Sequence, residues 1–89
     1  MTRVAAVHDL ATIAGIEQES FGGGAWSRQL IREHLEGAHH AVLVHDEVAY
    51  AAISVLGDVA DLDRIAVLPP ARRQGIAGML LQQLIIVAR

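Results

Sequence analysis

The chain has 89 residues and a formal net charge of −3, with seven arginines and neither cysteine nor lysine. This length fits one domain, and a hydrophobic content of 53% excludes a disordered chain because it supplies enough apolar side chains for a core. The absent residue types exclude disulfides, cysteine-ligated zinc and Schiff-base chemistry, and no apolar run approaches the roughly 20 residues of a membrane span. Since the net charge is negative as well, we expect a cytoplasmic protein with no nucleic-acid or membrane partner.

The N-terminal segment predicts a strand followed by a helix. Residues 2–7 form a short apolar stretch that suits a first strand. The apolar spacing across residues 10–16 predicts a helix that ends near residue 19 or 20, with Asp9 as its N-cap. We expect Glu17 and Glu19 to lie on the surface of this helix.

A glycine-rich segment separates this helix from a second one. Residues 22–24 are three glycines, which predict a mobile linker; a phosphate role is disfavoured because they follow a helix and lack the GxGxxG spacing. Ser27 is a good N-cap for a helix that ends at Gly37. Trp26, just before the cap, occupies the position of a hydrophobic staple.

The second half of the chain predicts three strands and a helix. Residues 41–44 and 48–55 are β-like runs separated by a polar turn, and they predict an antiparallel hairpin. A third strand follows over residues 59–68, where two prolines stop it, and helical spacing resumes after Gly75. The predicted order is β-α-α-β-β-β-α, an α/β (α+β) domain over residues 1–89 with a mostly antiparallel sheet flanked by helices.

The five histidines predict no metal site. His39 and His40 are adjacent, so in a strand they point to opposite faces, and His8, His34 and His45 lie on separate predicted elements. No two of them have HxH or HxxxH spacing, and no cysteine supports them. We interpret them as surface residues.

Asp61 and Asp63 are two positions apart in a predicted strand, so their carboxylates should share a face. Two interpretations stay open. The pair could bind a cationic amine or help to deprotonate it. Alternatively, it is a solvated strand edge whose charge Arg64 balances.

The segment from Ile65 to Gly78 carries the clearest functional pattern. A buried strand ends at two prolines, paired arginines follow, and a helix begins at or just before Gly75. The free N–H groups of a helix N-terminus attract anions, and the small residues here leave room for a phosphate. The guanidinium groups of Arg72 and Arg73 could each donate two hydrogen bonds to that phosphate. The sequence therefore predicts an anion site in this loop.

The residues of this loop, Arg-Arg-Gln-Gly-Ile-Ala over 72–77, fit the Q/R-x-x-G-x-G/A signature and resemble the GNAT acetyltransferases. The Trp26-Ser27 pair before the second helix is similar to that of the bacterial ribosomal-protein N-terminal alanine acetyltransferases. The resemblance implies that the loop holds the pyrophosphate of acetyl-CoA and that the preceding strand pairs with its pantetheine arm, one strand N–H polarising the thioester carbonyl. The cofactor-binding residues so implied are Ile65, Ala66, Val67, Arg72, Arg73, Gln74, Gly75, Ile76, Ala77 and Gly78.

The implied reaction is acetyl transfer to a primary amine, most simply the N-terminal α-amine of a ribosomal protein, with no metal. Trp26, Ser27, Asp61 and Asp63 are candidates for the acceptor side. In the family, the glutamate base and tyrosine acid lie in a C-terminal third that would follow Arg89, so no catalytic residue is assigned. We expect an incomplete acetyltransferase domain, with a homodimer that supplies the missing strand or a non-catalytic acyl-CoA-binding module as alternatives.

Overall fold

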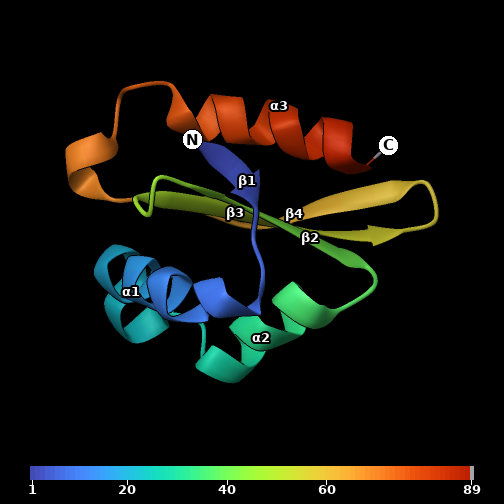
Figure 1. The fold of residues 1–89 in the computed structure, drawn as a ribbon, viewed down its shortest axis with the longest axis horizontal. Coiled ribbons are helices and arrows are strands. Elements are labelled where there is room, and N and C mark those ends of the chain that lie inside the picture. The colour runs from blue at the N-terminus through green and yellow to red at the C-terminus, as the bar shows by residue number, and fades with distance from the viewer. Residues whose placement is uncertain (89) are drawn as a thin grey trace.

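A four-stranded antiparallel sheet lies between two helical layers, with α1 and α2 on one face and α3 on the other (Figure 1). The structure is a computed structural model that describes residues 1–88. Three short 3-10 helices, Val7–Asp9, Gly22–Gly24 and Pro69–Ala71, connect the larger elements. Those elements are β1 (Thr2–Val4), α1 (Leu10–Phe21), α2 (Arg28–Glu36), β2 (His40–His45), β3 (Ala49–Leu56), β4 (Val59–Val67) and α3 (Ile76–Ala88).

The strands follow one another across the sheet in the order β1-β2-β3-β4, which confirms the predicted element order and fold class. The β2–β3 connection, residues 46–48, has positive φ at both Asp46 and Glu47, and the Val48 N–H donates to the His45 carbonyl at 3.0 Å, as in a type I′ turn. β4 pairs only with β3, so its other edge has no neighbouring strand within the described residues.

A β-bulge interrupts the pairing of β3 with β4. Ala52 lies opposite Arg64, and Ile53 lies opposite Leu62, which leaves Asp63 as an extra residue on β4. A bulge re-aims the side chains beside it. Here both Asp63 and Arg64 make hydrogen bonds to α1 or α2, on the same side of the sheet.

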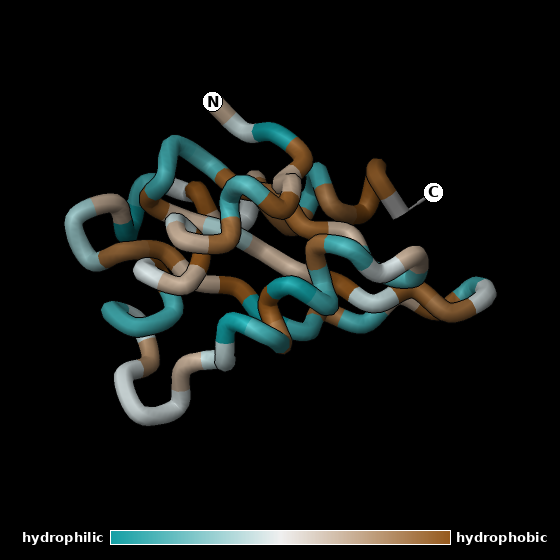
Figure 2. The backbone as a smooth tube through the Cα atoms, turned by 60° about the horizontal axis from the view of Figure 1, so that its bottom comes forward, coloured by the Kyte–Doolittle hydropathy of each residue, from teal (hydrophilic) through white to brown (hydrophobic). Residues whose placement is uncertain are grey.

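Two hydrophobic cores lie on the two faces of the sheet. The core beneath α1 and α2 includes Ile13, Ile16 and Ile31, and the core beneath α3 includes Leu80 and Leu84. Figure 2 shows hydrophobic segments along the middle of the sheet and near the C-terminus, with hydrophilic segments at several turns. Among the described residues, no helix is both long enough and apolar enough to cross a membrane.

Three local predictions were wrong in whole or in part. Asp9 occupies the N-cap position of α1, as predicted, but its side chain makes no capping bond to that helix: it accepts from the Ala6 N–H at 2.9 Å and binds the Arg3 guanidinium with both carboxylate oxygens. Residues 22–24 form a 3-10 helix where a mobile linker was predicted. Glu17 is fully buried, because a charged partner from β4 reaches it.

Candidate functional site

The connection from β4 to α3 folds back on the end of the strand. The Arg72 Nε donates to the Val67 carbonyl at 2.8 Å, and Arg73 and Gly75 both adopt positive φ, at 66° and 76°. Glycine accepts this backbone without strain, so the chain can turn sharply into α3. The helix begins at Ile76, one residue later than the predicted start at or just before Gly75.

The first turn of α3 presents unpaired backbone donors. The first four N–H groups of any α-helix lack an intrahelical acceptor, and the helix dipole makes this end attractive to anions. A Cβ placed on Gly75 or Gly78 would meet no heavy atom within 4 Å, so the backbone there is open to a ligand. The predicted anion site has the geometry that it needs.

The outer edge of β4 presents further backbone groups. The Leu68 N–H donates to the Val48 carbonyl at 2.8 Å, and polar groups alternate between the two edges of an antiparallel strand. The N–H and C=O groups of Val67 and Ile65 therefore point away from β3. The Val67 carbonyl accepts from the Arg72 side chain, and the other outward groups have no neighbouring strand among the described residues.

Two adjoining hollows, of about 310 and 240 Å³, connect this strand edge with the helix start. Both are lined by Val67, Arg72 and Ala77, so the two hollows adjoin along these residues, and we call them together the groove. Gln74 does not line it; its side-chain amide donates to the Pro70 carbonyl at 3.4 Å. The other predicted cofactor residues that line the groove are Ile65, Ala66, Arg73, Gly75, Ile76 and Gly78.

The end of α1 supplies a wall of the groove that the sequence analysis missed. Ser20 and Phe21 line the larger hollow beside β4. The Phe21 ring also lies 3.6 Å from the Arg64 guanidinium carbon, a cation–π contact. In the sequence, the only feature that indicated this wall was an aromatic residue at the end of a helix, directly before three glycines.

The acceptor-side candidates Trp26 and Ser27 do not line the groove. Ser27 caps α2 as predicted, since its hydroxyl accepts from the Leu30 N–H at 3.1 Å. Trp26 is half-buried against the core beneath α1 and α2, and its backbone N–H donates to the Glu17 carboxylate at 2.7 Å. Both residues thus organise the α1–α2 connection.

Asp61 and Asp63 occupy different environments despite their spacing. Asp61 is exposed, as the solvated-edge interpretation expects. Asp63, on the bulge, accepts from the Ser54 hydroxyl and lies 3.0 Å from the His34 Nε2. The sequence spacing alone could not reveal this difference, because nothing in it marks the bulge.

A buried carboxylate ties α1 to the sheet next to the groove. Glu17 accepts two hydrogen bonds from Arg64, at 2.8 and 2.9 Å, one from the Trp26 N–H and one from the Tyr50 hydroxyl. Burial, the largest influence, raises the pKa of Glu17, but these donors outweigh it and hold the pKa below its usual value. Burial and the bond to Glu17 raise the pKa of Tyr50 far above its usual range. Glu17 therefore stays ionised, Tyr50 stays protonated, and neither is poised as a base.

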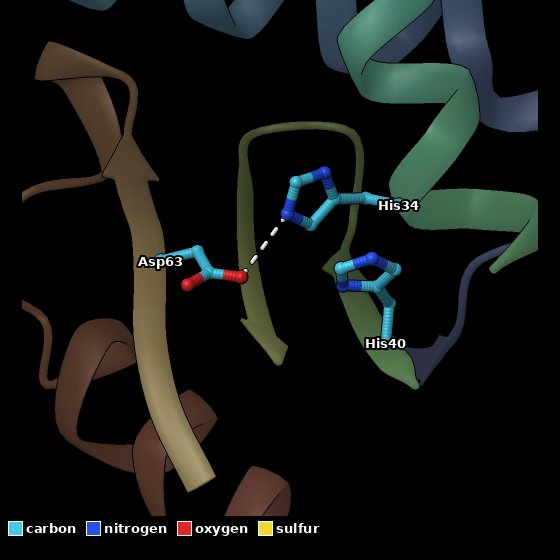
Figure 3. Close-up of side chains that lie close together, drawn as sticks. All are labelled: His34, His40 and Asp63. Atoms are coloured by element: carbon cyan, nitrogen blue, oxygen red, sulfur yellow. Dashed lines mark hydrogen bonds and ion pairs between the residues drawn. The ribbon is translucent and has the colours of Figure 1, made fainter. Parts of the chain in front are cut away.

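The interpretation of every histidine as a surface residue was wrong for His34, His40 and His45, which are all partly buried. His34 from α2 and His40 from β2 lie side by side, with ring centroids 4.2 Å apart, and both face Asp63 (Figure 3). Only 10% of the His34 side chain is exposed. Their proximity comes from the packing of α2 on the sheet, which no sequence spacing encodes.

The fold and the groove define a class of protein: an α+β domain in which an open strand edge lies beside a helix N-terminus. A family model described as "Acetyltransferase (GNAT) family" matches residues 7–89, and the chain belongs to this family. A comparison with curated proteins gave no match.

Solved structures agree with this assignment. The ribosomal-protein-S18-alanine N-acetyltransferase from Escherichia coli is 29% identical, with a TM-score of 0.81 over 99% of this chain and 59% of that one. The chain thus spans less than two thirds of that relative's length. The PaiA N-acetyltransferase from Thermoplasma acidophilum, solved in complex with coenzyme A, shares the fold at 15% identity and a TM-score of 0.83, over 99% and 70% of the two chains. An aminoglycoside 6'-N-acetyltransferase from Acinetobacter haemolyticus also shares the fold, at 22% identity and a TM-score of 0.79, over 99% of this chain and 70% of that one.

Proposed function

We propose that this chain is the acetyl-CoA-binding part of an N-acetyltransferase that acts on a primary amine. The observation that carries the proposal is the groove, two adjoining hollows that reach from the outer edge of β4 to the first turn of α3. An acyl-CoA has an amide-bearing arm that ends in a pyrophosphate. A site for it therefore needs a strand edge to pair with the amides, followed by an anion site for the pyrophosphate. The groove offers both in that order.

Each part of the groove then has a role. The outward N–H and C=O groups of Ile65 and the N–H of Val67 pair with the amides of the arm or donate to the thioester carbonyl. The N–H groups from Gly75 to Gly78 hold the pyrophosphate, because a helix N-terminus favours negative charge. Arg73 is exposed beside these groups, so its guanidinium adds a charge-assisted contact.

The thioester supplies an acyl group that is activated toward attack by an unprotonated amine. This step also needs a base for the ammonium and an acid for the leaving thiolate. The residues that line the larger hollow include no carboxylate, imidazole or phenol within the described part of the chain. That observation supports an alternative function, an acyl-CoA-binding module without catalysis, which the experiments below separate from the enzyme.

For the acceptor, we propose a protein N-terminal α-amine of a small residue such as alanine. The support is the 29% identity to an enzyme named for ribosomal-protein alanine acetylation, together with the Trp26-Ser27 pair. In this fold the pair contributes through the α1–α2 connection, because neither side chain lines the groove.

Calorimetric titration of acetyl-CoA into the full chain tests the binding step. Gly78→Glu should weaken binding at least about tenfold, or roughly 1.4 kcal/mol, because the new side chain points into open space that the phosphate needs and brings a like charge. Gly15→Glu is the matched control: Gly15 is also an exposed helical glycine with no heavy atom within 4 Å of an added Cβ, but it lies outside the groove. Equal affinities of the two variants would refute the proposed site.

Release of free thiol tests the transfer step. We expect thiol release from acetyl-CoA with a peptide that begins with alanine, and none with the same peptide already acetylated at its N-terminus. Acetyl-CoA binding that is lost in Gly78→Glu, without thiol release on any free amine, would support the non-catalytic module instead.

A further inference from the structure

We propose that His34, His40 and Asp63 form a binding site for a divalent transition-metal ion, with Zn²⁺ the best match. This site is separate from the groove and does not rest on the proposed function. One ligand-capable atom from each side chain lies within 4.8 Å of the other two. Tetrahedral Zn²⁺, with bonds of about 2.0–2.2 Å, places its ligand atoms roughly 3.3–3.6 Å apart, so the cluster needs only a small contraction.

The His34 ring has acceptors on both of its nitrogen atoms. Its Nδ1 lies 3.1 Å from the Leu30 carbonyl, which can only accept, so Nδ1 carries a hydrogen. Its Nε2 lies 3.0 Å from the Asp63 Oδ2, also an acceptor when the carboxylate is ionised. In the neutral ring the Nε2 lone pair therefore faces the Asp63 carboxylate, and a metal ion bound by both atoms would satisfy these two acceptors.

The bond from Nδ1 to a backbone carbonyl is also the usual support of a metal-ligating histidine. It fixes the tautomer and aims the Nε2 lone pair at the metal. The Leu30 carbonyl belongs to the same helix as His34, one turn earlier, so the ring orientation is built into α2.

Ser54 gives the other two members of the cluster a similar support. Its hydroxyl donates to the Asp63 Oδ2 and lies 3.1 Å from the His40 Nδ1. Figure 3 shows both rings on one side of the gap and the carboxylate on the other. One hydroxyl thus holds an imidazole from β2 and a carboxylate from β4 close together.

The surroundings hold the two rings in place before any ion binds. The His34 ring stacks on Trp26, at 4.6 Å between centroids and 29° between planes, and His40 packs on its other side. A Cβ added to Gly37 would lie 2.4 Å from the His40 Cδ2, so the ring keeps its position only because residue 37 is glycine.

Charge and access also suit a cation. The Asp63 side chain is 23% exposed, so the ion can enter and keep water at a fourth position. Arg64, the nearest basic residue along β4, is engaged with Glu17 and does not neutralise Asp63. The two imidazoles make this ligand set suitable for Zn²⁺, whereas Mg²⁺ and Ca²⁺ prefer sets made of oxygen ligands alone.

Calorimetric titration of ZnCl₂ into the metal-stripped, tag-free full chain tests the site. We expect one Zn²⁺ per chain, and at least about a hundredfold weaker binding in His34→Ala and in His40→Ala, since each removes one of three protein ligands. His39→Ala is the matched control, because His39 is the exposed neighbour of His40 and lies outside the cluster. Ser54→Ala, which removes only the support, should weaken binding by about ten- to a hundredfold.

Thermal unfolding with and without Zn²⁺ keeps the test informative if a variant folds poorly. Zn²⁺ should raise the Tm of the unaltered chain and of His39→Ala by several degrees, and it should leave the Tm of Asp63→Asn almost unchanged. Mg²⁺ should leave the Tm of all three proteins unchanged. The proposal is overturned if the unaltered chain binds no Zn²⁺, or if His39→Ala loses as much affinity as His34→Ala and His40→Ala.

Discussion

The two faces of the sheet are packed by different means. Beneath α1 and α2, three carboxylates are mostly shielded from solvent, and each has a hydrogen-bonding partner: Glu17 bonds to Arg64, Asp9 to Arg3 and Asp63 to His34. Beneath α3, the buried cluster is entirely apolar. Polar contacts are directional, so they fix one arrangement of helix on strand, whereas apolar contact is non-directional and tolerates small shifts.

This difference matters for the groove, because its two walls come from the two layers. Phe21, at the end of α1, contributes one wall, and the loop before α3 contributes the other. The Arg64 guanidinium contacts both Glu17 and the Phe21 ring, so the polar network fixes the first wall. The four predictions below test the contrast between the faces.

The largest effect is expected from Arg64→Met. This change leaves the Glu17 carboxylate fully buried without its cation, and breaking such a pair costs about 3–5 kcal/mol of the free energy of unfolding. Urea denaturation measures the loss. Arg32→Met, at an exposed position of α2, is the matched control and should change stability by less than about 0.5 kcal/mol. Similar losses in the two variants would show that the network does not hold the face together.

Tyr50→Phe comes next, with an expected loss of about 2 kcal/mol. The change removes a hydroxyl that donates to a buried carboxylate and leaves the ring's packing intact. In a Glu17→Gln background the same change should cost less, because a neutral amide accepts a weaker bond. A double-mutant cycle from urea denaturation measures this coupling, and a coupling near zero would contradict the network.

The third prediction concerns acid stability and the most open of these ion pairs. The hydrogen bond from Arg3 lowers the pKa of Asp9 to about 2 from its ordinary 3.8. A carboxyl whose pKa is lowered by folding contributes stability above its unfolded pKa and loses it as the pH falls through the folded value. We expect a contribution of about 1 kcal/mol at pH 7, reduced by screening because Arg3 is 47% exposed, and lost between pH 3.8 and about 2.

Asp9→Asn should therefore be less stable than the unaltered chain at pH 7 and converge with it toward pH 2. Asp58→Asn, at an exposed turn, is the control and should run parallel to the unaltered chain across this range. A constant difference between Asp9→Asn and the unaltered chain down to pH 2 would exclude the ion pair as the cause.

The contrast between the faces also explains which features the sequence could predict. The element order followed from apolar periodicity, the Ser27 cap and the prolines after β4, all of which are local signals. The groove loop was equally predictable, since Arg72 to Gly78 are contiguous and a helix N-terminus is an anion site by itself.

The polar networks were not predictable in the same way. The hydrogen bonds of Glu17 join residues 33 and 47 positions apart, and the contact of His34 with Asp63 spans 29 positions. Each depends on how a helix packs on the sheet, and the last also depends on a bulge that shifts β4 by one residue. Alternating strand patterns assume regular pairing, so they assign such side chains to the surface.

The smallest effect is expected on the outer side of α3. Ile85 is 55% exposed and lines a hollow of about 180 Å³ with Leu62 from β4, so Ile85→Gln should change the free energy of unfolding by less than about 0.5 kcal/mol. Its neighbour Leu84 is 1% exposed, and Leu84→Ala should cost about 2–5 kcal/mol by opening a cavity. Urea denaturation compares the two variants. A loss in Ile85→Gln as large as that in Leu84→Ala would mean that another surface covers this side of α3 in solution, and sedimentation of the unaltered chain would then show self-association that the variant lacks.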